Sequence, residues 1–421
     1  MGTASTTSVA DDPDSNAEAG SARPTAPGDR IVSLDALRGF ALLGILVINI
    51  WLFSMPLAAA ENPPTFGDFS GVNYAAWVLS HVFFEMKFVT LFTILFGAGI
   101  VLFTESKERK DQPALRLHYR RTIVLLLVGL GHAYLLWYGD ILVAYALCAL
   151  LAVFARNWRP RTLVAVGLVL LIIPSVLFAS MGLVVHELPE DDLAMWQPTD
   201  EQVQEEIDAY QGGWLEQMDH RVPTAAALQT VSFAFWTFWR TIGVMLFGMA
   251  LFKRGVLSNE RSERFYRRLL VGGGALGLGL VLAGVWYRSY HDWAFVESVF
   301  FATQFNYWGS LPLAGAYIAG IMLWCRHRPE GLLTSGFSAV GRTAFSNYLL
   351  QTVLATTIFY GHGLGLFATV TRVEQLAVVL LIWAIQVPLS MLWLRHFRFG
   401  PVEWVWRTLT YGDRQPLRKR R

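Results

Sequence analysis

Two histidines and their acidic neighbours are the residues of this chain best suited to proton transfer. His81 and Glu85 are four residues apart, and His132 precedes Asp140 by eight. Histidine titrates near neutral pH, and a neighbouring carboxylate can orient it as a general base. Arg240 lies in the middle of an apolar segment, where an arginine can stabilise a developing negative charge. These five residues form the candidate catalytic group.

Other interpretations of the same residues remain open. His81 also suits a lipid headgroup zone, and His132, which lies among small residues, also suits a contact between helices. A zinc site built on His81, Glu85 and His132 is disfavoured, because one His-x-x-x-Glu pair is weak evidence for a metal. An unpartnered arginine inside a membrane is costly, so we expect Arg240 to meet Glu85 or to line water.

A second polar group comes from two short stretches, RIVSLDALRGF near the N-terminus and GRTAFSNYLLQ in the C-terminal third. Asp35 and Arg38 are three residues apart, so they share a helix face and can pair. These stretches predict a cationic pocket for a phosphorylated ligand. A structural ion pair with amide hydrogen bonds between helices is the alternative. The candidate binding residues are Arg30, Asp35, Arg38, Arg342, Asn347 and Gln351.

Composition indicates which elements carry these residues. The chain of 421 residues is 54% hydrophobic and 16% charged, and its mean hydropathy is +0.40. A soluble domain has about a quarter charged residues. The apolar residues recur in runs close to the roughly 20 residues needed to cross the hydrocarbon of a bilayer. The sequence therefore predicts a membrane protein that crosses a lipid bilayer several times.

Segregated charge predicts how the protein lies in the membrane. Loops rich in Lys and Arg, such as Lys107–Arg121, alternate with loops that carry few, and basic loops stay on the cytoplasmic side. We therefore expect an all-α polytopic membrane helix bundle in an inner (plasma) membrane, with both termini cytoplasmic. The roughly ten predicted transmembrane helices are Ala36–Met55, Tyr74–Phe103, Thr122–Tyr138, Ile141–Phe154, Thr162–Val185, Gln229–Phe252, Leu269–Trp286, Tyr307–Cys325, Ala339–Phe359 and Glu374–Arg395.

Five regions follow from this topology. Residues 1–29 form a disordered cytoplasmic tail, 30–185 the first five transmembrane helices, and 186–228 an acidic extracytoplasmic loop. Residues 229–397 form the last five transmembrane helices, and 398–421 a cytoplasmic interfacial helix and basic tail. Trp196, Tyr210 and Trp214 in the acidic loop predict that part of it folds over the membrane surface.

Several common chemistries find no support in the sequence. Cys148 and Cys325 have neither a disulfide framework nor metal-ligand spacing, so no metal is expected. Glycine-rich runs fall inside predicted spans, where Gly273 and Gly277 suit close helix packing better than phosphate binding. No P-loop or Gly-x-Ser-x-Gly elbow is present in the sequence. The net charge of +2 gives no indication of a nucleic-acid partner.

Five stretches of the chain resemble the bacterial family called domain of unknown function 418, the YeiB-like membrane proteins. They are RIVSLDALRGFALLGILVINI, KFVTLFTILFGAGI, GHAYLLWYGDILVAYAL, VGRTAFSNYLLQT and FGPVEWVWRTLTYG. The resemblance covers roughly Arg30–Phe154 and Phe235–Gly412. It implies a polytopic membrane fold in a bacterial cell membrane and, by itself, no reaction.

The first stretch is also distantly similar to the opening of integral membrane acyltransferases. The shared Arg…Asp-x-x-Arg-Gly pattern corresponds here to Arg30, Asp35, Arg38 and Gly39. In that group an acyl group from a cytoplasmic coenzyme A thioester reaches a glycan on the opposite side of the membrane. The resemblance implies acyl-CoA as the donor substrate, no covalently bound cofactor, and an envelope glycan or lipid as acceptor.

One difference from those acyltransferases affects the choice of catalytic base. The sugar O-acyltransferases carry a histidine late in the first span, where this chain has Asn49. We therefore expect His132 to act as the base, with His81 as the second choice. Arg38 and Arg342 would then bind the phosphates of the donor.

Two rival functions use the same residues differently. A transporter or exporter of a small molecule or lipid-linked substrate would line its translocation path with these polar groups. Transporters often contain internal repeats, and the two halves of this chain show no convincing repeat. A non-catalytic membrane partner of an envelope complex is the third possibility.

Overall fold

The computed structural model describes residues 31–185 and 196–419. The predicted N-terminal tail, Arg30, the first part of the acidic loop and the last two residues lie outside the described residues. Regular structure in the described part is helical, and the β-type pairing found there is an isolated bridge between Phe397 and Arg418. The prediction of an all-α fold is confirmed.

Sixteen α-helices follow one another along the described residues. They are α1 Val32–Ser54, α2 Leu57–Glu61, α3 Gly71–Phe83, α4 Lys87–Glu108, α5 Ala114–Leu135, α6 Leu142–Ala152, α7 Pro160–Val184, α8 Asp200–Gln211, α9 Met218–Ala227, α10 Phe238–Lys253, α11 Glu263–Tyr290, α12 Thr303–His327, α13 Leu332–Arg342, α14 Ala344–Phe359, α15 Arg372–His396 and α16 Pro401–Tyr411. Short 3-10 or π-helical segments cover Pro63–Thr65, Val153–Asn157, Leu228–Thr237 and Glu297–Ala302.

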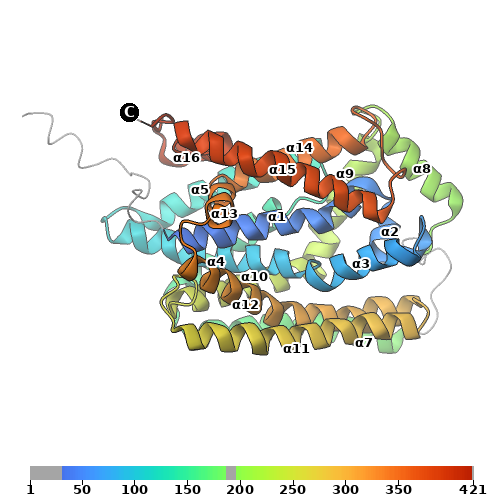
Figure 1. The fold of residues 1–421 in the computed structure, drawn as a ribbon, viewed down its shortest axis with the longest axis horizontal. Coiled ribbons are helices and arrows are strands. Elements are labelled where there is room, and N and C mark those ends of the chain that lie inside the picture. The colour runs from blue at the N-terminus through green and yellow to red at the C-terminus, as the bar shows by residue number, and fades with distance from the viewer. Residues whose placement is uncertain (1–30, 186–195, 420–421) are drawn as a thin grey trace, which may run out of the picture.

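Most of the long helices run roughly along one axis of the molecule, with α1 in the interior (Figure 1). Helix α16 lies at one end, on the left of the view, and α2 and α8 lie at the other. Helices α7 and α11 form one edge and expose most of their apolar side chains. Such exposure suits contact with lipid, because a helix that is apolar all round must be covered by protein or by a membrane.

Seven helical stretches in the described residues are long and apolar enough to cross a membrane. They are Val32–Ser54, Gly71–Glu108, Pro160–Val184, Met218–Lys253, Glu263–Tyr290, Glu297–His327 and Arg372–His396. The other three predicted spans are occupied by α5, α6 and the pair α13–α14, which are shorter or carry more charge. The polytopic membrane bundle is confirmed, and the number of ten spans stays a prediction.

Two predicted spans are interrupted, which corrects the expectation of continuous helices. The span Tyr74–Phe103 divides into α3 and α4 just before Lys87, at a point where Met86 has a positive φ of 63°. The span Ala339–Phe359 divides into α13 and α14 at Thr343. Both segments are predominantly apolar, and hydropathy averaged over a span does not register a break of one or three residues.

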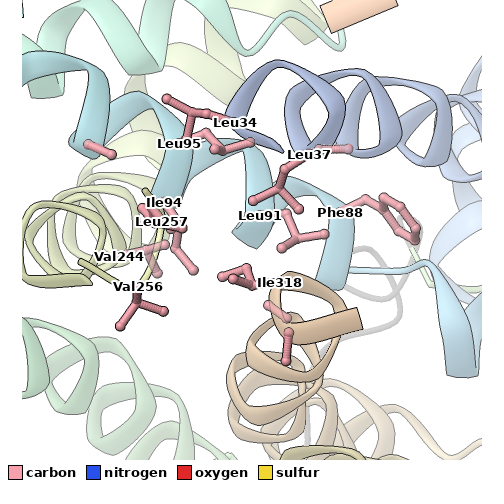
Figure 2. Close-up of a cluster of buried hydrophobic side chains, with 14 of the residues drawn as sticks. Leu34, Leu37, Phe88, Leu91, Ile94, Leu95, Val244, Val256, Leu257 and Ile318 are labelled. Carbon is pink, nitrogen blue, oxygen red and sulfur yellow. The ribbon is translucent and has the colours of Figure 1, made fainter. Parts of the chain in front are cut away.

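One large buried cluster joins α1, α4, α10 and α12. Leu37 of α1, Leu91 of α4 and Ile318 of α12 converge there (Figure 2). Lipid chains are as apolar as leucine, so such contacts stabilise the bundle through van der Waals packing rather than through transfer from water. The cluster requires that these helices approach closely.

Glycines allow such close approach between α4 and α10, where a Cβ on Gly97 would lie 2.1 Å from the carbonyl oxygen of Met245, and at two further helix contacts. A Cβ on Gly39 of α1 would lie 1.9 Å from the carbonyl oxygen of Phe337, and a Cβ on Gly341 would lie 1.9 Å from the carbonyl oxygen of Asp35. The backbones of α1 and α13 are therefore in direct contact. On α11, Cβ atoms at Gly273 and Gly277 would lie 2.6 Å and 2.8 Å from carbonyl oxygens of α12, as the helix-packing interpretation of this glycine run requires.

The end of the molecule opposite α16 is closed by α2, α8 and α9, which we call the cap. Tyr210 of α8 is fully buried, and its carbonyl accepts a hydrogen bond from the N–H of Gly361 (2.9 Å). The carboxylate of Glu206 accepts the N–H of Leu57 at 3.1 Å. Trp196 accepts a hydrogen bond from Asn62 through its carbonyl. The described part of the acidic loop therefore folds back onto the bundle.

We predict that Gly39→Ala destabilises the protein, because its new methyl group would overlap the Phe337 carbonyl and push α1 and α13 apart. Overpacking of this kind typically costs about 1–3 kcal/mol. Gly279→Ala on α11 is the matched control, because no atom lies within 4 Å of its Cβ position. Thermal unfolding of both variants in detergent checks this, and equal midpoints would contradict the close contact.

We also predict that Glu206 makes a pH-dependent contribution to the stability of the folded protein. Burial raises its pKa to about 7 from the ordinary 4.5, although the hydrogen bond from Leu57 opposes the rise. The folded state therefore holds the proton more tightly than the unfolded chain, so this stabilisation is complete below about pH 4.5 and is lost as the pH rises through 7. Glu206→Gln mimics the protonated side chain.

The thermal unfolding midpoint of Glu206→Gln should therefore rise relative to that of the wild type as the pH is raised from 5 to 8. Asp208→Asn, an exposed change on the same helix, serves as the control. A difference between Glu206→Gln and wild type that stays constant over this range would refute the raised pKa.

Candidate functional site

A cavity of about 1040 Å³ lies at the end of the bundle that carries α16. Its wall combines segments far apart in the chain, from α1, α4, α5, α10, the α13–α14 junction and α16. Eight basic and four acidic side chains line it. The basic residues are Arg38, Lys107, Arg109, Lys110, Arg121, Lys253, Arg342 and Arg407, and the acidic residues are Asp35, Glu105, Glu260 and Glu403.

This arrangement brings basic loops of the predicted topology to one end of the molecule. The ends of α4 and α10 with the loops that follow them, and the α13–α14 junction, line the same cavity as the C-terminal helix. The cap lies at the other end (Figure 1). Clustering of basic loops at one end is what the positive-inside pattern requires.

Arg38 and Asp35 pair on the face of α1 that borders the cavity. Arg38 Nη1 donates to Asp35 Oδ1 at 3.0 Å, and the two side chains are 29% and 15% exposed. The close contact at Gly39 holds this face of α1 against α13, whose last residue is Arg342. Two of the predicted binding arginines therefore line one cavity together with Asp35.

Aromatic faces hold several of the other cations. The guanidinium of Arg121 lies 4.4 Å from the ring centroid of Trp406, and Lys107 Nζ lies 4.6 Å from that of Tyr411. A cation–π contact attracts the charge without neutralising it. The cavity therefore keeps an excess of positive charge, which attracts anionic ligands.

Glu403 has a structural role at the rim of this cavity. Its carboxylate accepts the N–H of Phe345 at 2.7 Å and that of Ser346 at 3.2 Å, at the amino end of α14. It also accepts the hydroxyl of Ser346. Burial raises the pKa of Glu403, while these hydrogen bonds act in the opposite direction. Helix α16 is thereby fastened to α14, and the cavity wall is completed.

Asn347 and Gln351 do not join the arginines, which corrects the predicted pocket. Asn347 Nδ2 donates to Thr343 at 2.9 Å and to Ser390 at 2.8 Å, and Gln351 Nε2 donates to Gln386 at 3.1 Å. Both side chains are buried between α14 and α15. Their spacing places them on the same side of α14, but that side faces α15 rather than the cavity.

The structure brings His132 of α5 and Asp140 together. His132 Nδ1 lies 2.7 Å from Asp140 Oδ1, and the two side chains are 1% and 0% exposed. The second carboxylate oxygen accepts the N–H of Val143 at 2.8 Å. A third residue completes the group, because His132 Nε2 lies 2.9 Å from the hydroxyl of Thr352 on α14.

Tyr348 connects this buried group with the cavity. Its side chain lines the cavity, and its ring centroid lies 5.1 Å from that of His132. Its hydroxyl accepts the N–H of Ile141, which also lines the cavity, at 3.3 Å. The His132 group therefore lies directly behind one aromatic side chain of the cavity wall.

His81 and Glu85 form a separate pair beside the break between α3 and α4. Glu85 contacts His81 Nδ1, and the ring of His81 stacks on Trp77 at 4.7 Å. Lys87 follows the break, is fully buried, and donates to the His81 carbonyl (2.7 Å) and to Asn306 Oδ1 (2.5 Å). A cation at the carbonyl end of α3 is favourable, and it accounts for the local break.

Arg240 contacts neither Glu85 nor the cavity wall, contrary to the expectation from its position. Its guanidinium donates to Thr90 (3.0 Å), to Ser310 (2.8 Å) and to the Tyr307 carbonyl (3.3 Å), and it lies over the Tyr307 ring. Neutral oxygens therefore satisfy this buried cation. Its contacts join α10 to α4 and α12.

The candidate residues thus separate into the cavity arginines, the His132 group, the His81 pair and Arg240. Within the described residues, no group of three or more His, Cys, Asp and Glu side chains is placed to hold a metal ion. Sequence reasoning missed Tyr348, which lies between Asn347 and Gln351, and Thr352, which directly follows Gln351. Only packing of α14 on α5 distinguishes them, and neither residue type carries a local signal.

Known proteins similar to this chain extend over nearly its full length. The family described as Protein of unknown function (DUF418) matches residues 251–413. The uncharacterized protein YxaH of Bacillus subtilis (strain 168) is 33% identical over 418 residues, which cover 95% of this chain and 99% of that protein.

Two further relatives cover similar shares. The uncharacterized protein YeiB of Escherichia coli (strain K12) is 32% identical over 384 residues, 91% of this chain and 96% of that protein. An uncharacterized 39.9 kDa protein in the amylase 3′ region of Bacillus acidopullulyticus is 27% identical over 400 residues. Together with the family match over residues 251–413, these similarities show that the chain belongs to the DUF418 family of YxaH and YeiB.

Proposed function

We propose that this protein transfers an acyl group from an acyl-CoA, held in the basic cavity, to a hydroxyl or amine of an envelope glycan or lipid. The observation that carries the proposal is the position of the His132–Asp140 pair directly behind the wall of a cavity rich in arginine and lysine. The cavity supplies donor binding, and the histidine supplies the base.

The cavity suits a long polyanionic donor in charge and size. Arginine forms strong hydrogen bonds with phosphate and keeps its charge, and Arg38, Arg121 and Arg342 all line the wall. The volume of about 1040 Å³ is at the upper end of the usual range for ligand pockets, about 300–1,000 Å³. A nucleotide with a pantetheine arm needs a pocket of this class.

The polarity of the wall changes along its length in the order that acyl-CoA requires. Phe92 and Glu105 both line the cavity, and their separation on α4 corresponds to roughly 20 Å at 1.5 Å per residue. Along α4 the lining changes from charged side chains at Glu105, Lys107 and Arg109 to apolar Phe92 and Phe96, and Leu142 and Tyr348 also line the cavity. The phosphates would lie near the arginines, and the thioester would lie near Tyr348.

His132 would act as the general base for the acceptor. Asp140 accepts from Nδ1–H, so Nε2 is the nitrogen that can take a proton. The buried His81–Glu85 pair and Arg240 have no part in this proposal, because their contacts join α3, α4, α10 and α12. We further propose that the cavity opens to the cytoplasm of a bacterial cell and that the cap faces the envelope.

One observation favours the alternative function of a transporter. A membrane span interrupted next to a buried charge, as at Met86 and Lys87, is a common feature of substrate sites in transporters. Accumulation of an anion in sealed vesicles, without release of a thiol from acyl-CoA, would identify that function.

Binding of coenzyme A tests the donor site. Arg38→Gln should weaken the affinity of purified protein in nanodiscs for CoA by about 10–100-fold, because a charge-assisted hydrogen bond contributes about 1.5–3 kcal/mol. Arg264→Gln is the control, since Arg264 is exposed on α11 outside the cavity wall. Isothermal titration calorimetry measures both. Absence of CoA binding by the wild type, or equal affinity in both variants, would rule out this donor site.

Labelling of introduced cysteines tests the orientation. Both native cysteines are buried, so Glu105→Cys at the cavity and Glu205→Cys on α8, both at exposed positions, should dominate reaction with an impermeant maleimide. We expect Glu205→Cys to react in intact cells and Glu105→Cys to react only in inverted vesicles. Reaction of both from the same side, or the reverse pattern, would exclude transfer in the proposed direction.

A further inference from the structure

Three buried side chains form a hydrogen-bonded series that joins α5, the start of α6 and α14. Asp140 Oδ1 lies 2.7 Å from His132 Nδ1, and His132 Nε2 lies 2.9 Å from the hydroxyl oxygen of Thr352. His132 and Thr352 are 220 residues apart in the chain. A hydroxyl, an imidazole and a carboxylate in this order make up the arrangement that activates a hydroxyl as a nucleophile.

The contacts around the series give each group a defined role. Asp140 is oriented by the N–H of Val143, which donates to its second oxygen at 2.8 Å. A carboxylate can only accept from Nδ1–H, so the neutral imidazole has Nε2 as its acceptor nitrogen. The hydroxyl of Thr352 therefore donates to Nε2, and its oxygen lone pairs remain available for attack.

The orientation of Thr352 differs from that of other threonines in these helices. Thr90, Thr93 and Thr343 donate to the carbonyl four residues earlier, at 2.6 Å, 2.7 Å and 2.9 Å. That bond is the usual solution for a helical threonine in an apolar environment. The hydroxyl of Thr352 is instead directed at His132, as a nucleophile beside its base would be.

Tyr348 determines access to this hydroxyl. It precedes Thr352 by one helical turn on α14, lines the cavity and packs against the His132 ring. Thr352 is 1% exposed, so the Tyr348 side chain must swing aside before a thioester in the cavity reaches the hydroxyl. Burial keeps water away from the group, and exclusion of water protects an acyl ester from hydrolysis.

We propose that Thr352 is the nucleophile and carries the acyl group as an ester between donor and acceptor. This inference rests on the proposed function and deepens it. Thr352 Oγ1 attacks the thioester carbonyl carbon while His132 Nε2 takes its proton. The C–S bond then breaks, and the thiolate of CoA leaves with the proton from His132.

The second half of the reaction restores the protein. An acceptor hydroxyl or amine attacks the ester carbonyl carbon, and His132 Nε2 takes the acceptor proton. The bond between the acyl carbon and Thr352 Oγ1 breaks, and the proton passes to that oxygen. The acyl group has moved from sulfur to oxygen or nitrogen without any change in oxidation state. Donor and acceptor need not be bound together, so each can enter from its own side.

The test is intact-protein and peptide mass spectrometry of purified protein incubated with acetyl-CoA in the absence of an acceptor. We expect one acetyl group per protein, located on the peptide that contains Thr352, and a burst of free CoA of about one equivalent. Thr352→Ser keeps the hydroxyl and should keep the adduct at the same position. Valine has nearly the same shape as threonine but lacks the hydroxyl. In Thr352→Val the rate of the CoA burst should therefore fall by at least 100-fold, while the affinity for CoA is unchanged.

The possible results distinguish the role of Thr352 as nucleophile from the proposed acyltransferase function. Release of CoA by Thr352→Val at the wild-type rate, or an acetyl group on another residue, overturns the role of Thr352 and leaves the proposed function standing. A wild-type protein that neither binds CoA nor releases it from acetyl-CoA overturns the proposed function and this inference together. If Thr352→Val fails to bind CoA or to fold, Thr352→Ala provides the same comparison, and the location of the wild-type adduct decides.

Discussion

The direct backbone contact between α1 and α13 is the constraint on which the rest of the candidate site depends. Glycines on both helices, Gly39 and Gly341, leave no room for a Cβ, so the two backbones approach as closely as their atoms allow. The contact places Asp35 and Arg38 beside Arg342 at one end of the cavity. It also sets the starting position of α14, and α14 presents Tyr348 to the cavity and Thr352 to His132.

Burial of charge is the second constraint. A charged side chain inside an apolar bundle is costly unless it meets an acceptor, a donor or water, and each cation of the interior has found such a partner. Arg221 and Arg372 donate to backbone carbonyls at the cap, and Lys87 donates to the carbonyl end of α3. These contacts fasten helix ends to one another. The cations of the cavity also have partners, such as Asp35 for Arg38 and the Trp406 ring for Arg121, but these cations line an open volume as well.

The same distinction between the bundle interior and the cavity explains why only some of the polar residues take part in the proposed mechanism. Arg240 is surrounded by oxygens of Thr90, Ser310 and Tyr307, so its charge stabilises helix contacts. Asn347 and Gln351 do the same between α14 and α15. A polar side chain inside the membrane needs a hydrogen-bonding or ionic partner. The identity of that partner decides whether the side chain has a structural or a catalytic role.

Local patterns predicted the fold class, the membrane character, the Asp35–Arg38 pair and the His81–Glu85 pair. Each depends on neighbours within one helix, where spacing alone determines which side chains share a face. The same patterns missed the break at Met86, because a two- or three-residue interruption leaves the hydropathy of a long apolar segment unchanged. They also assigned Gln351 to a pocket, since spacing does not say which neighbour a helix face meets.

The sequence by itself determined that this chain is a helical membrane bundle and which loops carry its positive charge, because hydropathy and charge are read along one dimension. Only the tertiary structure decided that basic segments from α4, α10, α13 and α16 surround one cavity. It alone joined His132 to Thr352, 220 residues away. Contacts between distant segments follow from the packing of small residues and from the need to pair every buried polar group, and neither is recorded in any single stretch of sequence.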